Sequence, residues 1–398
     1  MRVMHTADWH LGRLLEGRSR LEEQAQVLDE LERLVREEQV DLVLLAGDVY
    51  DSVNPPAAAE QLFYDAIARL GDQGRRPVVV IAGNHDNPER LAASGPLAAR
   101  QGITLVGLPT AEPVAVDIAR TGERAVVAAL PYPSESRLRE LLTDELDQEL
   151  LRGAYSERVA SLLRRQAAQF RPDTVNLAIS HLYVLGGYES DSERPIQVGG
   201  AYTVDPSAFD IGAQYTGLGH LHRPQAVKAS SRIRYCGSPL AYSFSEAGQA
   251  KSVTLLDVKP GEEPVTQEIF LSSGRPLVKW RATEGLEQVH RWMDDGRDAH
   301  GWVELDVHLT ESMGMEQIQQ LRKRHGGLVT IRPIYQSVET EAADAVGARE
   351  QLPADELFRR FYARQTGGAQ AEPELVQLFL ELLLEGGAAQ DEEGGAAS

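Results

Sequence analysis

The chain has 398 residues, which exceeds one ordinary domain and indicates two or three. Its composition, 42% hydrophobic and 25% charged, is that of a globular protein and excludes wholesale disorder, collagen-like repeats and a small disulfide scaffold. The 60 acidic against 40 basic residues give a net charge of −20, which argues against a generic basic nucleic-acid coat. A nucleic-acid enzyme stays possible, because metal ions can supply positive charge to a cleft.

The first half of the chain alternates short apolar runs with amphipathic segments, a pattern typical of an α/β domain. Residues 40–46 and 77–82 are nearly continuous apolar runs and predict buried strands. Apolar residues recur at helical spacing from Leu21 to Val35, and a second helix is expected to begin at Asn54-Pro55. We expect further strands at 103–106, 114–118, 126–130, 174–180 and 214–218, and further helices at 135–151 and 156–170. A run of strands from Arg232 to Phe270 favours a second sheet packed on the first.

The pattern changes near Gly274-Arg275-Pro276. Strands at 302–309 and 328–334, with helices at 286–293 and 315–321, predict a small α+β module. A small, polar stretch then predicts a linker, and two short helices are expected at 355–363 and 373–385. The predicted parts are a main domain 1–274, the module 275–340, a linker 341–350, a helical segment 351–386 and a disordered tail 387–398.

The segment MRVMHTADWHLG lacks the apolar core of a secretory signal, and no apolar run approaches the ~20 residues of a membrane span. The single cysteine, Cys236, excludes an intrachain disulfide and suits a reducing compartment. We therefore expect a soluble, cytoplasmic protein without a membrane partner.

Five short motifs with histidine, carboxylate or amide side chains each follow an apolar run, where α/β sheets place their sites. They are Asp8-Trp9-His10, Gly47-Asp48-Val49-Tyr50-Asp51, Gly83-Asn84-His85-Asp86, His181 and Gly219-His220-Leu221-His222. In the first and last motifs, an extended backbone would point residues two apart in the same direction. Taken one at a time, most of these motifs are better explained by a strand-end turn or a structural histidine than by a functional site.

Taken together, the motifs supply a mixed set of oxygen and nitrogen donors. Such a set suits borderline divalent ions such as Mn²⁺, Fe²⁺ or Zn²⁺, and one cysteine excludes a thiolate site. Enough candidate ligands exist for two ions that share one bridging carboxylate: Asp8, His10, Asp48, Asn84, His181, His220 and His222. His85 would remain free for general acid work on a leaving oxygen.

The order DWH, GDVYD, GNHD, a lone histidine and GHLH resembles the calcineurin-like metallophosphoesterase superfamily. The segments DWHLG, GNHDNPERL, SHLYVLGGYESDSERPIQVGG and YTGLGHLHRPQ resemble the bacterial SbcD family, strongly over residues 1–275 and more weakly beyond. That family provides the nuclease subunit of the SbcC–SbcD DNA-end-processing complex. The resemblance implies two packed mixed β-sheets flanked by helices, a small α+β capping domain that binds DNA, and C-terminal helices that bind the partner.

The resemblance also implies a role for each motif residue. One metal ion would be held by Asp8, His10, Asp48 and His222, and the other by Asp48, Asn84, His181 and His220. His85 would be the catalytic histidine that binds no metal. Asp51 stands where archaeal relatives carry histidine, and we expect it to orient His85, as an aspartate does in the wider superfamily. Ser52 stands where the protein phosphatases of the superfamily carry arginine, which argues against that branch.

The resemblance implies a nuclease with 3′→5′ exonuclease activity on double-stranded ends and endonuclease activity on single strands and hairpins. Its cofactors would be two divalent metal ions, Mn²⁺ in the family. Its partners would be DNA, an SbcC-type coiled-coil ATPase at the C-terminal helices, and a second copy in a homodimer. The chain contains no GxxxxGK[ST] sequence, so we do not expect it to hydrolyse ATP through a P-loop.

Two alternatives stay open. The first is a small-molecule phosphodiesterase with the same two-metal core, and the second is a chain that chiefly bridges an ATPase and DNA. DNA binding needs local cations, because screening over about 8–10 Å makes remote acidic residues matter little. The candidates for phosphate contacts are Arg13, Arg18, Arg20 and the run Arg322-Lys323-Arg324, which is equally typical of a solvated helix end.

Overall fold

The structure is a computed structural model, and it describes residues 1–134, 137, 155–190, 192–193, 202–228, 230–310, 313–335, 353–365, 371 and 373–380. It divides into two units, Met1–Tyr335 and Gln336–Ser398. The predicted helix at 135–151 (apart from Arg137), the linker at 341–350, residues 381–386 of the predicted helical segment and the tail at 387–398 lie outside the described residues. Among the helices that are described, none is both long and apolar enough to cross a membrane.

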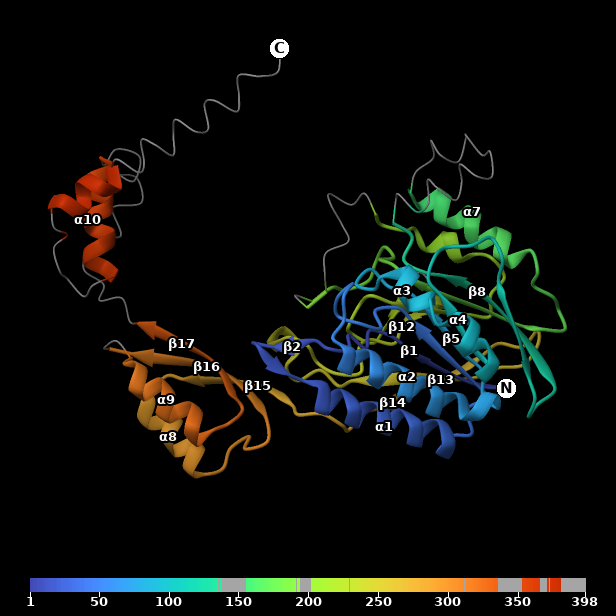
Figure 1. The fold of residues 1–398 in the computed structure, drawn as a ribbon, viewed down its shortest axis with the longest axis horizontal. Helices are drawn as coiled ribbons and strands as arrows, with labels where there is room; N and C mark the ends of the chain where they lie inside the picture. The colour runs from blue at the N-terminus through green and yellow to red at the C-terminus, as the bar shows by residue number, and fades with distance from the viewer. Residues whose placement is uncertain are drawn as a thin grey trace, which may run out of the picture. The chain divides into compact units, whose positions relative to one another are not determined.

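Two six-stranded mixed sheets form the body of the first unit (Figure 1). The strands of the first sheet, in spatial order, are β14 (Val265–Phe270), β13 (Ser252–Asp257), β1 (Arg2–Thr6), β4 (Leu42–Ala46), β5 (Val78–Ile81) and β6 (Ile103–Val106). Those of the second sheet are β11 (Gln225–Val227), β12 (Ser230–Tyr235), β10 (Tyr215–Gly219), β9 (Val175–His181), β8 (Glu123–Leu130) and β7 (Val114–Ile118). Four adjacent strands run parallel in each sheet, β1-β4-β5-β6 in the first and β12-β10-β9-β8 in the second.

Helices cover the outer faces of both sheets. The first sheet packs against α1 (Leu21–Glu37) and α2 (Ala57–Gly71), and the second packs against α7 (Tyr155–Ala167). Shorter elements within the described residues are β2 (Leu14–Leu15), β3 (Arg18–Ser19), α3 (Pro88–Ala92), α4 (Gly95–Ala98), η1 (Asp72–Gly74), η2 (Ala99–Gln101), η3 (Pro206–Phe209) and η4 (Phe244–Glu246).

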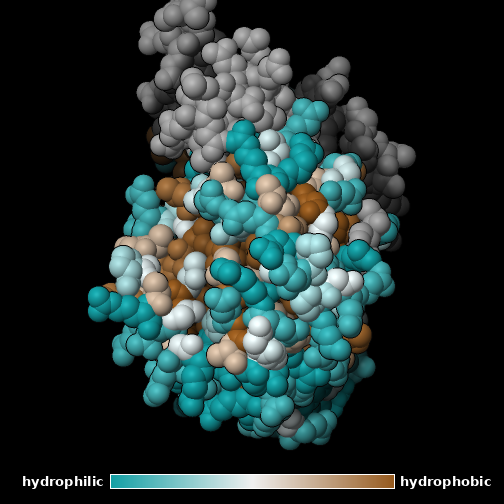
Figure 2. All heavy atoms as spheres, turned by 90° about the vertical axis from the view of Figure 1, so that its right-hand side faces the viewer, coloured by the Kyte–Doolittle hydropathy of each residue, from teal (hydrophilic) through white to brown (hydrophobic). Residues whose placement is uncertain are grey.

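Successive side chains of β4 point to opposite faces of the sheet. Both faces are apolar because each one is covered by a core cluster. Val43 and Leu45 pack toward the helices with Phe63, whereas Leu42 and Leu44 join a second core cluster. That second cluster contains strand residues of both sheets, so it lies between them. The order of layers is therefore helix, sheet, sheet, helix, which confirms the predicted fold class. Figure 2 shows a largely hydrophilic face, as the acidic composition leads one to expect, with some apolar side chains gathered in its middle.

The small module contains a three-stranded parallel sheet with two helices. Its elements are β15 (Leu277–Ala282), α8 (Leu286–Asp294), β16 (Trp302–Leu309), α9 (Met315–Arg324) and β17 (Leu328–Tyr335). The predicted strands 302–309 and 328–334 are confirmed, but β15 was not predicted. Its buried Leu277, Trp280 and Ala282 alternate irregularly with Lys279 and Arg281, which hides the strand period.

The second helix begins later than predicted. Its first residue is Ala57, and Pro56 precedes it with an extended backbone, so the prediction of a start at Asn54-Pro55 was wrong. A residue before proline is disfavoured in the α region. Pro55 is followed by Pro56, and this pair of prolines therefore delays the helix.

The described part of the second unit contains α10 (Ala354–Gln365) and a further helical stretch at residues 373–380. The Phe358 ring stacks on the Phe379 ring with centroids 4.3 Å apart. Leu357, Phe361 and Leu378 nevertheless remain 46–57% exposed. The described parts of the two predicted helices thus contact each other and still present apolar side chains to solvent.

Candidate metal centre

The loops that follow β1 and β4 are joined by backbone hydrogen bonds. The Asp8 N–H donates to Gly47 O at 3.0 Å, and the His10 N–H donates to Asp48 O at 2.9 Å. Parallel pairing of β1 with β4 places both loops at the same edge of the first sheet. The first two motifs are therefore side by side because their strands are neighbours.

Four of the predicted ligands have a left-handed backbone. The φ angles are 55° at Asp8, 43° at His10, 47° at Asp48 and 103° at His220. The expectation that Asp8 and His10, or His220 and His222, lie on extended segments was therefore wrong, because β1 ends at Thr6 and β10 at Gly219. Such angles cost about 1–3 kcal/mol each in a non-glycine residue and cluster at functional sites.

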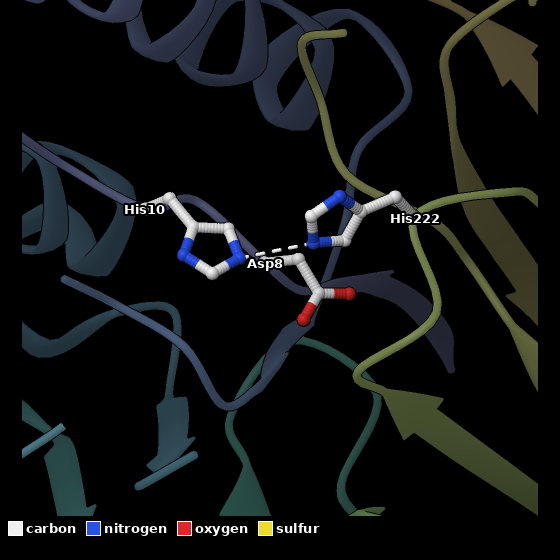
Figure 3. Close-up of side chains that lie close together, drawn as sticks. All are labelled: Asp8, His10 and His222. Atoms are coloured by element: carbon white, nitrogen blue, oxygen red, sulfur yellow. Dashed lines mark hydrogen bonds between the residues drawn. The ribbon is translucent and has the colours of Figure 1, made fainter. Parts of the chain in front are cut away.

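The first cluster of candidate ligands contains Asp8, His10 and His222, all buried. Figure 3 shows the two imidazole rings turned toward each other with the Asp8 carboxylate beside them. The two Nε2 atoms are 3.0 Å apart, and His10 Nε2 is 3.6 Å from Asp48 Oδ2. Three chain segments far apart in sequence thus direct ligand atoms to one point.

The second cluster contains Asp8, Asp48 and His181, with Asn84 next to it. His181 Nε2 is 2.9 Å from Asn84 Oδ1 and 3.4 Å from Asp48 Oδ2. The other ring nitrogen, Nδ1, donates to the carbonyl oxygen of Ala46 at 2.8 Å. If His181 is neutral, the lone pair on its Nε2 therefore faces Asn84 Oδ1 and Asp48 Oδ2. This arrangement is unfavourable unless a cation lies between the three atoms.

The charges in this buried region suit divalent ions. Burial favours the neutral form of Asp48, but His181, His10 and His85 outweigh it and hold the pKa of Asp48 well below its usual range. Burial is the main cause that lowers the pKa of His10, so its imidazole is neutral, as a metal ligand has to be. Burial lowers the pKa of His181, but the Asp48 carboxylate outweighs burial and raises this pKa to about 9. The proton on His181 thus supplies the positive charge that a metal cation would supply next to Asp48.

An unpartnered buried atom completes this fit. Asp8 Oδ2 has no hydrogen-bond partner within the described part of the chain, although the residue is fully buried. Burial raises the pKa of Asp8 well above its ordinary value. The residues present therefore fit metal ions, because carboxylate, amide and imidazole donors converge with unsatisfied lone pairs.

His220 lies next to the second cluster, but it contacts Asp8 through its backbone and not through its ring. Its backbone N–H donates to Asp8 Oδ1 at 2.9 Å, and its ring centroid is 5.5 Å from that of His181. Its ring nitrogens are in none of the three-residue clusters found among the described residues. His220 therefore positions Asp8, and its role as a ligand stays a prediction.

His85 is held from both sides. Its backbone N–H donates to Asp48 Oδ1 at 2.9 Å, and its Nδ1 donates to the backbone carbonyl oxygen of Asp51 at 2.7 Å. We expected the Asp51 carboxylate to make the second contact. That carboxylate instead lies 3.7 Å from His10 Nδ1 and 3.6 Å from Arg13 Nη1.

Asp86, which has no role among the predicted site residues, joins two motifs in the structure. Its carboxylate accepts the backbone N–H groups of Gly83, Val49 and Tyr50 at 2.8–3.1 Å. Burial raises the pKa of Asp86 to about 6. A Cβ atom at Gly83 would lie 2.1 Å from Asp48 Oδ1, so this loop needs glycine to approach the Asp48 carboxylate. In the sequence, the sign of this role is the acidic residue that directly follows His85.

A second set of residues that we missed surrounds His222. Ser192 Oγ is 2.8 Å from His222 Nδ1, and the Glu193 carboxylate accepts the His222 backbone N–H at 2.8 Å. Lys251 donates to the His222 carbonyl oxygen at 2.9 Å and also binds the buried Glu246 carboxylate. Ser190 and Glu193 lie within the segment SHLYVLGGYESDSERPIQVGG, but the spacing of its residues does not indicate a contact with His222.

A cavity of about 650 Å³ opens beside the centre. His85, Asp51, Arg13 and Ser192 are among its lining residues, so a substrate can reach the side chain of His85. Arg20 is different, because it is 1% exposed and both of its bonds to Glu23 are buried. The expectation that Arg20 contacts DNA was therefore wrong, whereas Arg13 lies at the cavity.

Comparison with known proteins gives a match over almost the whole chain. A family model described as calcineurin-like phosphoesterase matches residues 1–224, and one described as type 5 capsule protein repressor C-terminal domain matches residues 273–366. The SbcD subunit of the SbcCD nuclease of Bacillus subtilis (strain 168) is 52% identical over 385 residues, 96% of this chain and 97% of that protein. A Thermus thermophilus protein and a dimetal phosphatase from Danio rerio, both of known structure, are each 16% identical, with TM-scores of 0.34 and coverage of 67% of this chain and 98% of theirs.

Proposed function

The chain belongs to the SbcD family of calcineurin-like phosphoesterases, the nuclease subunit of the SbcCD complex, and on that premise we propose how its centre cleaves DNA. The proposed activities are 3′→5′ exonuclease cleavage of double-stranded ends and endonuclease cleavage of single strands and hairpins. The observation that carries the proposal is the buried convergence of His10 and His222 with their Nε2 atoms 3.0 Å apart.

We propose that the centre binds two Mn²⁺ ions. Asp8, His10, Asp48 and His222 would hold one ion, and Asp48, Asn84, His181 and His220 the other. Bound divalent ions hold phosphate oxygens and lower the pKa of water. The ionised Asp48, which contacts residues of both sets, supports its place as the bridging ligand.

His85 acts on the substrate in this proposal. Its Nδ1 must carry a proton, because the Asp51 carbonyl oxygen that it contacts can only accept. The remaining nitrogen, Nε2, is 4.0 Å from Asp48 Oδ2 and belongs to a side chain that lines the cavity. When Nε2 is also protonated, it can donate that proton to the leaving 3′ oxygen as a general acid.

The partners follow from the family and from the second unit. The family premise implies an SbcC subunit and DNA, and we propose that α10 and the helix at 373–380 bind the SbcC-type ATPase. Their exposed Leu357, Phe361 and Leu378 support that surface, since exposed apolar groups on adjacent helices mark partner sites. We also propose a homodimer, as the family resemblance implies.

A small-molecule phosphodiesterase is less well supported. Such an enzyme would need only the two-metal core, whereas identity of 52% to a nuclease subunit extends over 96% of the chain. A chain that only bridges an ATPase and DNA would not need the clustered donors around Asp8 and Asp48.

The test is digestion of end-labelled duplex DNA with Mn²⁺, with and without the SbcC-type ATPase and ATP. We expect mononucleotide or short products from the 3′ end, greater cleavage with the ATPase, and none after Asp48→Ala. Bis-p-nitrophenyl phosphate serves as the small-molecule comparison. Cleavage of that ester without cleavage of any DNA, alone or with the ATPase, would contradict the proposal.

A further inference from the structure

Several imidazoles of the centre have an evident partner for Nδ1. His181 donates to the Ala46 carbonyl oxygen, His85 donates to that of Asp51, and His222 contacts the Ser192 hydroxyl. Such partners decide which ring nitrogen carries the proton and leave the other free to act as a ligand. The distances are 2.7–2.8 Å, which is normal for hydrogen bonds.

His10 differs from these three imidazoles. Its Nε2 points at the centre, 3.0 Å from His222 Nε2, so as a neutral ligand it must carry its proton on Nδ1. That Nδ1 is buried and has no hydrogen-bond partner within the described residues. A carboxylate oxygen, Asp51 Oδ1, faces it at 3.7 Å.

The backbone keeps Asp51 close to His10. Its N–H donates to the Leu11 carbonyl oxygen at 3.3 Å, and its own carbonyl oxygen accepts from His85. Only the side chain can therefore rotate easily, and it is 35% exposed on the cavity side. A small rotation about the side-chain bonds is enough to turn a 3.7 Å approach into a hydrogen bond.

Arg13 approaches the same oxygen from another direction. Its Nη1 is 3.6 Å from Asp51 Oδ1 and is also buried without a hydrogen-bond partner in the described part of the chain. Its Nη2 is fixed by the Ser192 carbonyl oxygen at 2.9 Å, and its guanidinium lies over the Tyr242 ring. Two unsatisfied donors, one neutral and one cationic, thus converge on a single carboxylate.

We propose that Asp51 is a positioning residue for the metal ligand His10, with Arg13 holding the carboxylate in place. The side chain of Asp51 accepts the Nδ1 proton of His10, which fixes the tautomer that presents Nε2 to the ion. The backbone carbonyl of Asp51 separately orients His85. This inference rests on the metal centre of the proposed function, and it moves the role of the carboxylate from His85 to His10.

The test measures Mn²⁺ binding without DNA, by isothermal titration calorimetry of the full chain. The wild type should bind two ions, and Asp51→Ala should weaken one of them about 10–100-fold while the other is unchanged. Asp51→Asn keeps an acceptor oxygen and the shape, so its loss should be smaller. Arg13→Gln should weaken the same ion by less than Asp51→Ala. The visible absorption of bound Co²⁺ should change in Asp51→Ala, since the His10 ligand is altered.

The controls separate this inference from its alternatives. Asp117→Ala removes an exposed carboxylate and should bind both ions as the wild type does. His85→Ala should also retain both ions. Unchanged Mn²⁺ affinities and Co²⁺ spectrum in Asp51→Ala would overturn the inference while leaving the metal centre intact. Complete loss of one ion in that variant, even at saturating Mn²⁺, would also overturn it, because Asp51 would then be a ligand. Failure of the wild type to bind Mn²⁺ would overturn the proposed function as well.

Discussion

His10 Nε2 lies 3.0 Å from His222 Nε2, although the two residues are 212 positions apart and belong to loops of different sheets. If each ring carries its proton on Nδ1, two lone pairs face each other in a buried place. A cation between the rings removes that repulsion. The stability of the fold should therefore depend on metal binding.

Removal of metal should lower the melting temperature. Ligand at 100 times its dissociation constant stabilises a protein by about 2.7 kcal/mol, provided that it binds only the folded state. We expect Mn²⁺ to raise the melting temperature of chelator-treated protein, as measured by scanning fluorimetry. Asp48→Ala should abolish that rise. An equal melting temperature with Mn²⁺ and with chelator would contradict a metal centre of this kind.

Replacement of His85 should separate catalysis from metal binding. His85→Ala should retain two ions and lose about 10²–10⁴ in turnover, since general acid–base catalysis contributes that much. Metal content and DNA cleavage are measured on the same preparation. A His85→Ala protein without metal would show that His85 is a ligand.

Asp86 should be a structural requirement for two motifs at once. Asp86→Ala leaves three backbone N–H groups without their acceptor, and each buried unsatisfied donor costs about 1–3 kcal/mol. We expect a lower unfolding midpoint in urea and weaker Mn²⁺ binding. Glu89→Ala is the control, because this side chain is exposed only a few residues away. Wild-type stability in Asp86→Ala would refute the assigned role.

Glu30 of α1 should make stability depend on acid pH. Burial raises its pKa, but hydrogen bonds from Ser272 and Ser273 outweigh burial and lower the pKa below its ordinary value of 4.5. A carboxyl with a lowered folded-state pKa stabilises the fold above its unfolded pKa, and this contribution is lost as pH falls through the folded pKa. The difference in melting temperature between wild type and Glu30→Gln should thus be largest at pH 7 and become smaller below about pH 4.5.

The matched control for Glu30 is Glu22→Gln, an exposed position on the same helix. The melting temperature of Glu22→Gln should be close to that of the wild type both at pH 7 and below about pH 4.5. A difference for Glu30→Gln that grew toward acid pH would show that the pKa shift has the opposite sign.

The C-terminal helices should be needed for the complex and not for chemistry. Deletion from Gln351 onward should abolish co-purification with the SbcC-type ATPase and leave Mn²⁺-dependent cleavage of single-stranded DNA. Phe361→Ser, at a 57% exposed position, should weaken the complex, whereas Arg359→Ser on the same helix should matter less. Full-strength co-purification of the truncated chain would place the main contact elsewhere.

The sequence predicted the central strands of the first sheet well because β4 and β5 are continuous apolar runs with clear ends. The strands 103–106 and 114–118 have the predicted bounds, and β4 and β5 differ only at their ends. The left-handed angles at Asp8 and His10 could not be predicted, since they depend on hydrogen bonds to Gly47 and Asp48. The position of Ser192 depends on a long loop and carries no periodic signal.

The clustering of candidate ligands at the edges of two sheets also has a consequence for synthesis of the chain. Asp8, His10, Asp48 and Asn84 follow strands of the first sheet, whereas His181 ends a strand of the second sheet and His220 and His222 follow another. A ribosome delivers the first group long before the second. The nascent chain therefore cannot assemble the full set until His222 has left the exit tunnel, and tight ion capture would mark the moment when both sheets have docked.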